Sequence, residues 1–194
     1  MSRYPLSALL CAISCLASPL TAETLKLHLD PAQSQVSVRF SATLQSVSGR
    51  LGPAEGTIEF DPATGEATGE VRMDFTEAST GVGRRDRKMH TRILETDRYP
   101  GAVFHLERVD LANTLHQGDN DVQLRGTVDF HGSSHLVTFP ATVTVRGGQV
   151  RAKGWLEVPY IAWGIRDPSF FLLRVAKVVT VEIDVAGQLE GKQP

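Results

Sequence analysis

The sequence has little cysteine, and its two cysteines both lie near the N-terminus, at Cys11 and Cys15. If residues 1–22 are removed as a secretion signal, no thiol remains in the mature chain. A domain without thiols can form neither a disulfide nor a thiolate nucleophile, and it cannot bind a metal through cysteine. We therefore expect the mature domain to be stabilised by its hydrophobic core alone.

An excess of charge of one sign is also missing. The formal net charge is −2 over 194 residues, so the composition gives no electrostatic basis for binding nucleic acid. The apolar stretch at residues 6–16 is shorter than the roughly 20 residues that a membrane-spanning helix needs. With 41% apolar and 22% charged residues, the composition is typical of one globular domain.

Residues 1–22 have the organisation of a secretory signal peptide. One early positive charge, Arg3, precedes the apolar stretch, and the segment ends on the small residue Ala22. We expect cleavage after Ala22, with Ala17 as the weaker alternative, which predicts a mature domain of residues 23–194 in the bacterial periplasm. A lipid anchor on Cys15 is less favoured, because the leucine usual three residues before a lipidated cysteine is absent.

Apolar and polar residues alternate along the mature chain, as in half-buried antiparallel strands. The alternation covers residues 36–42, 71–75, 122–130, 137–145 and 179–185. Turn-forming sequences such as Asp61-Pro62-Ala63-Thr64-Gly65 separate these segments. The pattern predicts an all-β fold, and closure into an antiparallel barrel of about eight strands is favoured because it leaves no exposed edge. A barrel of this size is either filled by side chains or holds one small ligand, and the apolar inward positions favour an apolar ligand.

Residues 80–94 depart from this two-residue period. Val82, Met89 and Ile93 have a spacing typical of one helical face, which predicts one short helix. The rest of this helix is strongly basic, through Arg84, Arg85, Arg87 and Lys88. One interpretation is transient contact with an anionic membrane surface. The other is a solvated charged face, partly neutralised by neighbouring acids.

The order of short motifs resembles the YceI family of secreted, lipocalin-like barrels. The matching motifs begin with Leu29-Asp30-Pro31 and include Gly56-Thr57-Ile58-Glu59-Phe60-Asp61, Arg85-Asp86, Met89-His90, Tyr99-Pro100, Gly126-Thr127-Val128-Asp129-Phe130-His131-Gly132 and Trp163-Gly164-Ile165. They cover the chain from about residue 25 to residue 190. The resemblance implies a lipocalin-like β-barrel that binds a polyisoprenoid or other lipid in the periplasm.

The alternation predicts an apolar ligand inside the barrel. The resemblance implies that this ligand is a long lipid, of isoprenoid or isoprenoid-quinone type, and that the protein is not an enzyme. No other cofactor is expected. The side chains expected to line the cavity are Phe40, Phe75, Met89, Phe104, Phe130, Val137, Phe139, Phe170 and Ile183. Small inward residues at Val150, Ala152 and Gly154 would leave room for the ligand. Trp163 and residues 170–173 form either the rim of a portal or the start of a buried strand.

Two pairs of residues leave a metal-binding or enzymatic alternative open. His131 and His135 flank a predicted tight turn and could begin a zinc or copper site, although such sites usually need three or four protein ligands. The alternative is that both histidines are exposed on the hairpin. Asp86 and His90 are one helical turn apart and could act as a general base, or they could anchor the helix to the barrel.

A barrel embedded in the outer membrane shares the signal peptide and the strand alternation. Only 3 Tyr and 2 Trp are available for its two aromatic girdles, which disfavours it. Trp155 lies out of phase with the inward residues of its segment and is expected on the solvent face, where it could serve a dimer contact. The oligomeric state itself is left open by the sequence.

Overall fold

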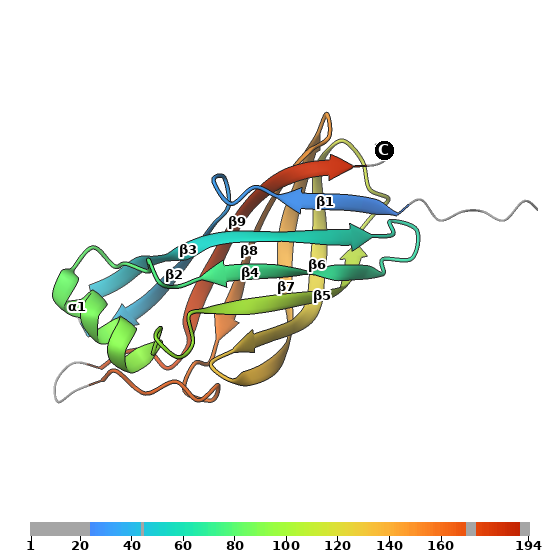
Figure 1. Ribbon diagram of the computed structural model, residues 1–194. Coiled ribbons are helices and arrows are strands. Elements are labelled where there is room, and N and C mark those ends of the chain that lie inside the picture. Colours follow the sequence, from blue (N-terminus) through green and yellow to red (C-terminus); the bar gives the residue numbers. More distant parts are fainter. Residues whose placement is uncertain (1–23, 44, 170–173, 191–194) are drawn as a thin grey trace, which may run out of the picture.

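The computed structural model describes residues 24–43, 45–169 and 174–190, and most of these residues lie in antiparallel strands (Figure 1). The nine strands are β1 (Leu25–Leu29), β2 (Gln35–Ala42), β3 (Gln45–Phe60), β4 (Ala67–Asp74), β5 (Gly101–Leu111), β6 (Gly118–Phe130), β7 (Ser133–Arg146), β8 (Gln149–Val158) and β9 (Val179–Glu190). Between β4 and β5, helix α1 (Gly83–Lys88) continues as a π-helical turn, η1 (Met89–Ile93). None of the helices in the described part of the chain is long and apolar enough to cross a membrane.

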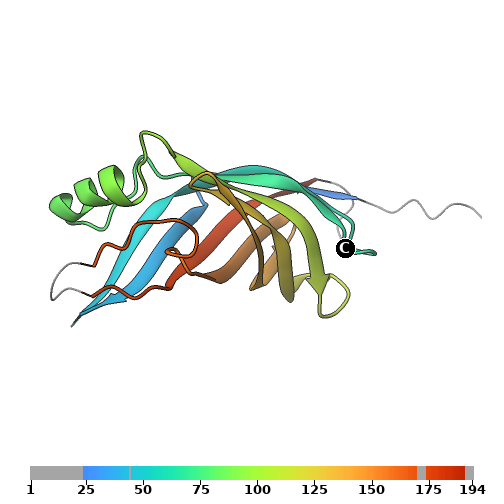
Figure 2. The same cartoon turned by 90° about the horizontal axis from the view of Figure 1, so that it is seen from below.

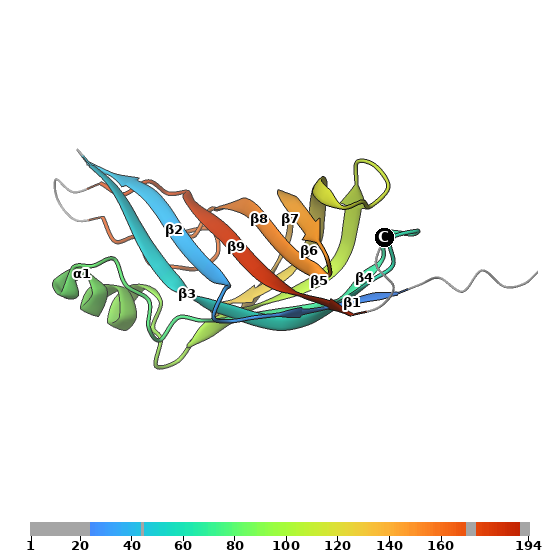
Figure 3. The same ribbon diagram turned by 90° about the horizontal axis from the view of Figure 1, so that it is seen from above.

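The strands close into a barrel with eight strand positions around its circumference. Seven of the positions are β3 to β9, which pair in sequence order from β3–β4 through β8–β9. The eighth position is shared by β1 and β2. β2 pairs with β9 from Arg39↔Thr180 to Gln35↔Asp184, and β1 continues along β9 from Leu29↔Gly187 to Lys26↔Glu190 (Figure 3). The predicted antiparallel barrel of about eight strands is confirmed.

The alternation in the sequence decides which side chains face the barrel interior. On β7 the buried positions are Val137, Phe139, Ala141 and Val145, whereas Thr138 is exposed. The same two-residue pattern on β6 buries Val122 and Val128. Because neighbouring strands are in register, their apolar residues form one continuous inner surface.

The helical segment lies at one end of the barrel, where β2 ends and β3 begins (Figures 1 and 2). The chain after β8 lies at the same end: Ile93 of η1 packs against the cluster of Val158, Tyr160 and Ile165. The helical segment and the chain after β8 therefore border the same end of the barrel.

The helix is shorter than residues 80–94, the range expected from the sequence. It begins at Gly83, since Ser79 and Thr80 are occupied by hydrogen bonds to the Asp86 side chain and do not enter the helix. Its last turn ends at Ile93, before Glu95 adopts a positive φ of 49°.

Candidate functional site

A large cavity of about 750 Å³ occupies the interior of the barrel. Side chains from all nine strands border it, and nearly all of them are aliphatic or aromatic. On β2, Val36, Val38 and Phe40 border the cavity while Ser37 and Arg39 do not, as the strand period requires. Its volume lies within the range of about 300–1,000 Å³ that is usual for ligand pockets. The barrel therefore has room for an apolar ligand.

Seven of the nine side chains expected to line the cavity do border it: Phe40, Phe75, Met89, Phe104, Phe130, Phe139 and Ile183. Val137 is buried, at 6% exposure, but does not border the cavity. Its register partner Gly126 is covered by the ring of Phe104, which also packs against Phe139, so side chains fill this part of the interior. Phe170 and the rest of residues 170–173 lie outside the described residues.

The small residues on β8 also lie where the alternation places them. Val150, Ala152 and Gly154 all border the cavity. A Cβ atom on Gly154 would lie 2.9 Å from the carbonyl oxygen of Pro140 on β7, so glycine permits the close approach of these two strands. Trp163 borders the cavity as well, in contact with Phe130.

The sequence analysis missed a polar end of the cavity. Arg85, Lys88 and Arg92 from the helical segment border it, together with Tyr160 and Arg166 from the segment after β8. The helical spacing contained a signal for the first three residues. Positions 85, 88 and 92 lie four, one and three residues from the apolar Met89 and share one helical face with it. Arg84, Arg87 and Lys88 are exposed, as expected for a basic surface, and Lys88 also borders the cavity. Arg85 departs from the expectation, because it is half-buried and lines the cavity.

Asp86 attaches the helical segment to the preceding loop. Its carboxylate accepts hydrogen bonds from Ser79 Oγ at 2.8 Å, from the Thr80 backbone N–H at 2.8 Å, and from the Thr80 hydroxyl. The hydrogen bond from the Thr80 side chain is the main cause that holds the pKa of Asp86 below its usual value, with the Thr80 N–H, Ser79 and the Arg85 charge adding to it. Asp86 therefore acts as an anchor in its ionised form.

His90 attaches the same segment from the other side. Its Nε2 lies 2.8 Å from the carbonyl oxygen of Ala78, and its Nδ1 lies 3.2 Å from Thr96 Oγ1. Both ring nitrogens are thus occupied, and no hydrogen bond or ion pair joins His90 to Asp86 within the described residues. Of the two interpretations of this pair, the geometry matches anchoring of the helix.

His131 and His135 do not lie exposed on their hairpin. The turn consists of His131 and Gly132, with φ angles of 50° and 81°, which is the geometry of a two-residue hairpin turn. The His131 side chain is only 13% exposed and packs on the Tyr99 ring, with centroids 4.1 Å apart. The His135 ring lies parallel to Trp163. Among the residues the structure describes, no group of three or more His, Cys, Asp and Glu side chains could hold a metal ion.

Comparison with known proteins assigns the fold to a family. The model of the YceI-like domain matches residues 27–187. The chain belongs to the YceI family. Among curated proteins, none matches this sequence significantly.

Several solved structures share this YceI fold, among them the following three. BcnA from Burkholderia cenocepacia is 19% identical with a TM-score of 0.70, over 81% of this chain and 98% of BcnA. A polyisoprenoid binding domain from Saccharophagus degradans, implicated in plant cell wall breakdown, is 18% identical with a TM-score of 0.68, over 84% of this chain and 98% of that domain. The Campylobacter jejuni YceI protein is 13% identical with a TM-score of 0.55, over 78% and 88% of the two chains.

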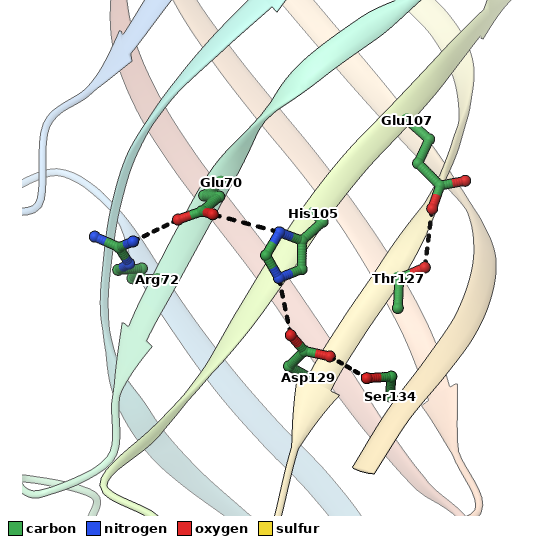
Figure 4. A network of polar contacts seen from close by, with 7 residues as sticks. All are labelled: Glu70, Arg72, His105, Glu107, Thr127, Asp129 and Ser134. Carbon is green, nitrogen blue, oxygen red and sulfur yellow. Dashed lines mark hydrogen bonds and ion pairs between the residues drawn. The ribbon is translucent and has the colours of Figure 1, made fainter. Parts of the chain in front are cut away.

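The outer face of this YceI barrel carries polar networks that lie away from the cavity. His105 on β5 lies between two carboxylates, with Nε2 at 2.9 Å from Asp129 Oδ2 and Nδ1 at 3.6 Å from Glu70 Oε1 (Figure 4). Arg72 pairs with Glu70, and Ser134 donates to Asp129. None of these side chains borders the cavity, so the network stabilises strand pairing on the solvent side.

Trp155 lies on the outer face, as its phase on β8 predicts. It is 50% exposed and borders a shallow outer groove with Pro140 and Lys153. It therefore does not contribute to the interior site.

Proposed function

We propose that this YceI-family protein is a secreted, periplasmic carrier that holds a long apolar lipid, of isoprenoid or isoprenoid-quinone type, inside its barrel. The observation that supports this most directly is the cavity of about 750 Å³ with its almost wholly apolar lining. Each methylene group buried there contributes about 0.8 kcal/mol. A long hydrocarbon chain therefore binds without a specific polar contact along its length. The name of the Saccharophagus degradans relative, a polyisoprenoid binding domain, supports the isoprenoid class.

The proposed role is binding and not catalysis. The residues that could have formed an acid–base pair, Asp86 and His90, both hold the helical segment in place. His131 and His135 pack against aromatic rings. The proposed periplasmic location depends on residues 1–22 acting as a signal peptide, and these lie outside the described residues.

Loading and release would take place at a membrane surface. Arg84 and Arg87 are exposed on the helical segment, at the same end of the barrel as the polar end of the cavity. Each such cation near an anionic leaflet contributes about 1 kcal/mol to membrane contact. We expect faster lipid transfer from vesicles that contain an anionic lipid than from purely zwitterionic vesicles, and a smaller difference for Arg84→Gln/Arg87→Gln.

The test of the carrier role is extraction of the protein, purified from the periplasm, with organic solvent, followed by mass spectrometry of the extract. An isoprenoid species in a stoichiometric amount would support the proposal. Ala152→Phe places a phenyl ring in the cavity between β7 and β9 and should abolish the bound species. The matched control is Ala63→Phe in the exposed turn after β3, which should retain it. An empty protein that also excludes an added apolar dye would contradict the proposal.

A further inference from the structure

Charge is distributed unevenly over the cavity lining. The charged residues that border the cavity are four cations, Arg85, Lys88, Arg92 and Arg166, and one anion, Asp167. All of them come from the helical segment and from the chain after β8, which lie at the same end of the barrel. A cavity that is apolar along its length and cationic at one end is complementary to a ligand with the reverse arrangement.

The cations at this end are mostly free to bind. Lys88, Arg92 and Arg166 form no ion pair with any residue in 24–43, 45–169 or 174–190. Arg85 is held in place: its Nε donates to Thr80 Oγ1 at 2.6 Å and its Nη2 donates to the Thr80 carbonyl oxygen at 3.0 Å. A guanidinium has five N–H donors, so Arg85 retains three for a ligand.

Tyr160 adds a polar atom without a partner to the same region. The residue is 6% exposed and borders the cavity, and its hydroxyl is buried with no hydrogen-bond partner among the described residues. A buried hydroxyl without a hydrogen-bond partner costs free energy, so such groups usually bond to a ligand or to water. Burial, with a contribution from Asp167, raises the pKa of Tyr160, so the hydroxyl keeps its proton and can donate it in a hydrogen bond.

We propose that the cavity binds an amphiphile with an oxyanion headgroup, phosphate or carboxylate, held by Arg85, Lys88, Arg92, Arg166 and the Tyr160 hydroxyl. This inference rests on the proposed function and specifies its ligand class. The hydrocarbon chain lies in the apolar part of the barrel, and the headgroup lies at the cationic end. Charge-assisted hydrogen bonds from guanidinium and ammonium groups to an oxyanion are roughly twice as strong as neutral ones. A neutral alcohol or quinone of the same chain length does not obtain this gain.

The experiment compares lipids that differ only in the headgroup. In Trp155→Phe protein, Trp163 is the single remaining tryptophan and borders the cavity, so its fluorescence reports binding. The probes are geranylgeranyl phosphate, geranylgeranoic acid and geranylgeraniol. We expect both anions to bind at least about tenfold more tightly than the alcohol, the size of one charge-assisted hydrogen bond. The difference should shrink as ionic strength rises from about 0.05 to about 0.5 M.

Variants assign the preference to the cationic end. Lys88→Gln/Arg92→Gln/Arg166→Gln should lose most of the preference for the two anions, and what remains is the contribution of Arg85 and Tyr160, which this variant keeps. The matched control is Arg50→Gln/Arg125→Gln/Arg146→Gln, which removes the same charge from exposed positions that do not border the cavity and should retain the preference.

The outcomes separate this inference from the proposed function. Equal affinity for the three probes in Trp155→Phe protein, which keeps every residue of the cavity lining, overturns the headgroup inference and leaves the carrier role intact. Binding of the phosphate but not of the carboxylate narrows the headgroup to phosphate and supports the inference. If none of the probes binds, the carrier role fails, and the headgroup inference fails with it.

Discussion

The imidazole of His135 lies flat against the indole of Trp163, with ring centroids 4.2 Å apart and planes only 2° from parallel. Trp163 is thereby held between a residue of β7 and Phe130, whose ring lies 6.4 Å away. Because Trp163 borders the cavity, this stack fixes part of the wall next to the cationic end.

We expect His135→Ala to release Trp163. In the Trp155→Phe background, the steady-state fluorescence anisotropy of Trp163 should fall, because the stacked ring no longer restrains the indole. His116→Ala, in the exposed loop before β6, is the matched control and should leave the anisotropy unchanged. Unchanged anisotropy in His135→Ala would show that packing against Phe130 alone is sufficient to hold the indole.

Ser34 attaches the link between β1 and β2, the two strands that share one barrel position, to β9. Its buried hydroxyl donates to the Ala186 carbonyl oxygen and accepts from the Ala186 N–H, both at 3.1 Å, in the gap between β1 and β2. Ser34→Ala leaves this N–H unpaired, and we expect the free energy of unfolding to fall by about 1–3 kcal/mol in urea denaturation. The exposed Ser41→Ala should change it by less than about 0.5 kcal/mol.

The Asp86 anchor predicts sensitivity to acid. Its pKa in the folded protein is lowered, first by the hydrogen bond from the Thr80 side chain. Its contribution to stability is therefore complete above the unfolded pKa of about 3.9 and is lost as the pH falls through the lower folded value. Asp86→Asn should be less stable at neutral pH by about 0.5–1.5 kcal/mol, because the partly exposed carboxylate is screened by solvent. It should also lose less of its Tm than the parent between about pH 5 and pH 2.

The matched control for this experiment is Asp97→Asn, in an exposed turn of the same segment. It should follow the parent protein at each pH. A parallel decline of Tm in the parent and in Asp86→Asn would contradict the anchoring role.

The polar network around His105 on the outer face predicts that the Asp129 carboxyl has a lowered pKa. The hydrogen bond from Ser134 is the largest cause that lowers the pKa of Asp129, followed by that from His105. In carboxyl-carbon NMR titrations, Ser134→Ala should raise the pKa of Asp129 toward its usual value, and His105→Ala should raise it less. Thr127→Ala removes a separate hydrogen bond to Glu107 on the same face (Figure 4) and should leave the Asp129 titration unchanged.

Loss of the Tyr160 hydroxyl should weaken ligand binding without lowering the stability of the protein. Tyr160→Phe removes a buried donor without a partner and keeps the ring, so the stability of the empty protein should stay the same or rise, by up to about 1–3 kcal/mol. The same variant should bind geranylgeranyl phosphate several-fold more weakly. A clear loss of stability in thermal denaturation would mean that the hydroxyl has a structural partner in solution.

The two-residue alternation was sufficient to predict most strands and the inward face. It was not sufficient for β3, which contains Gly49, Gly52, Pro53 and Gly56 and therefore has a low intrinsic preference for a strand. The structure explains these residues: a Cβ atom on Gly52 would lie 1.8 Å from the carbonyl oxygen of Asp74. The close approach of β3 and β4 depends on the tertiary structure, so the strand propensities of single residues do not predict it.

The candidate site was predictable in its apolar part only. Phe40 and Phe139 follow from strand phase, since every inward residue of a small barrel faces one interior. Arg166 follows from no local pattern, because its place at the cavity depends on how the chain after β8 packs on η1. The helical spacing places Arg85 and Arg92 on one face of the helix. That this face borders the cavity follows only from the position of the helix at the end of the barrel.

The division of one barrel position between β1 and β2 has a consequence for folding. Every other neighbouring pair of strands follows directly along the chain, whereas this position pairs residues of β2 with β9 residues almost 150 positions away, as in Gln35↔Asp184. Local hairpins can form early, but the ring closes only when the last strand arrives, and pairings of such sequence separation form slowly. Until then two strand edges are open to pairing with other chains. A nascent chain that lacks β9 would therefore be the species most prone to aggregate and most in need of a chaperone.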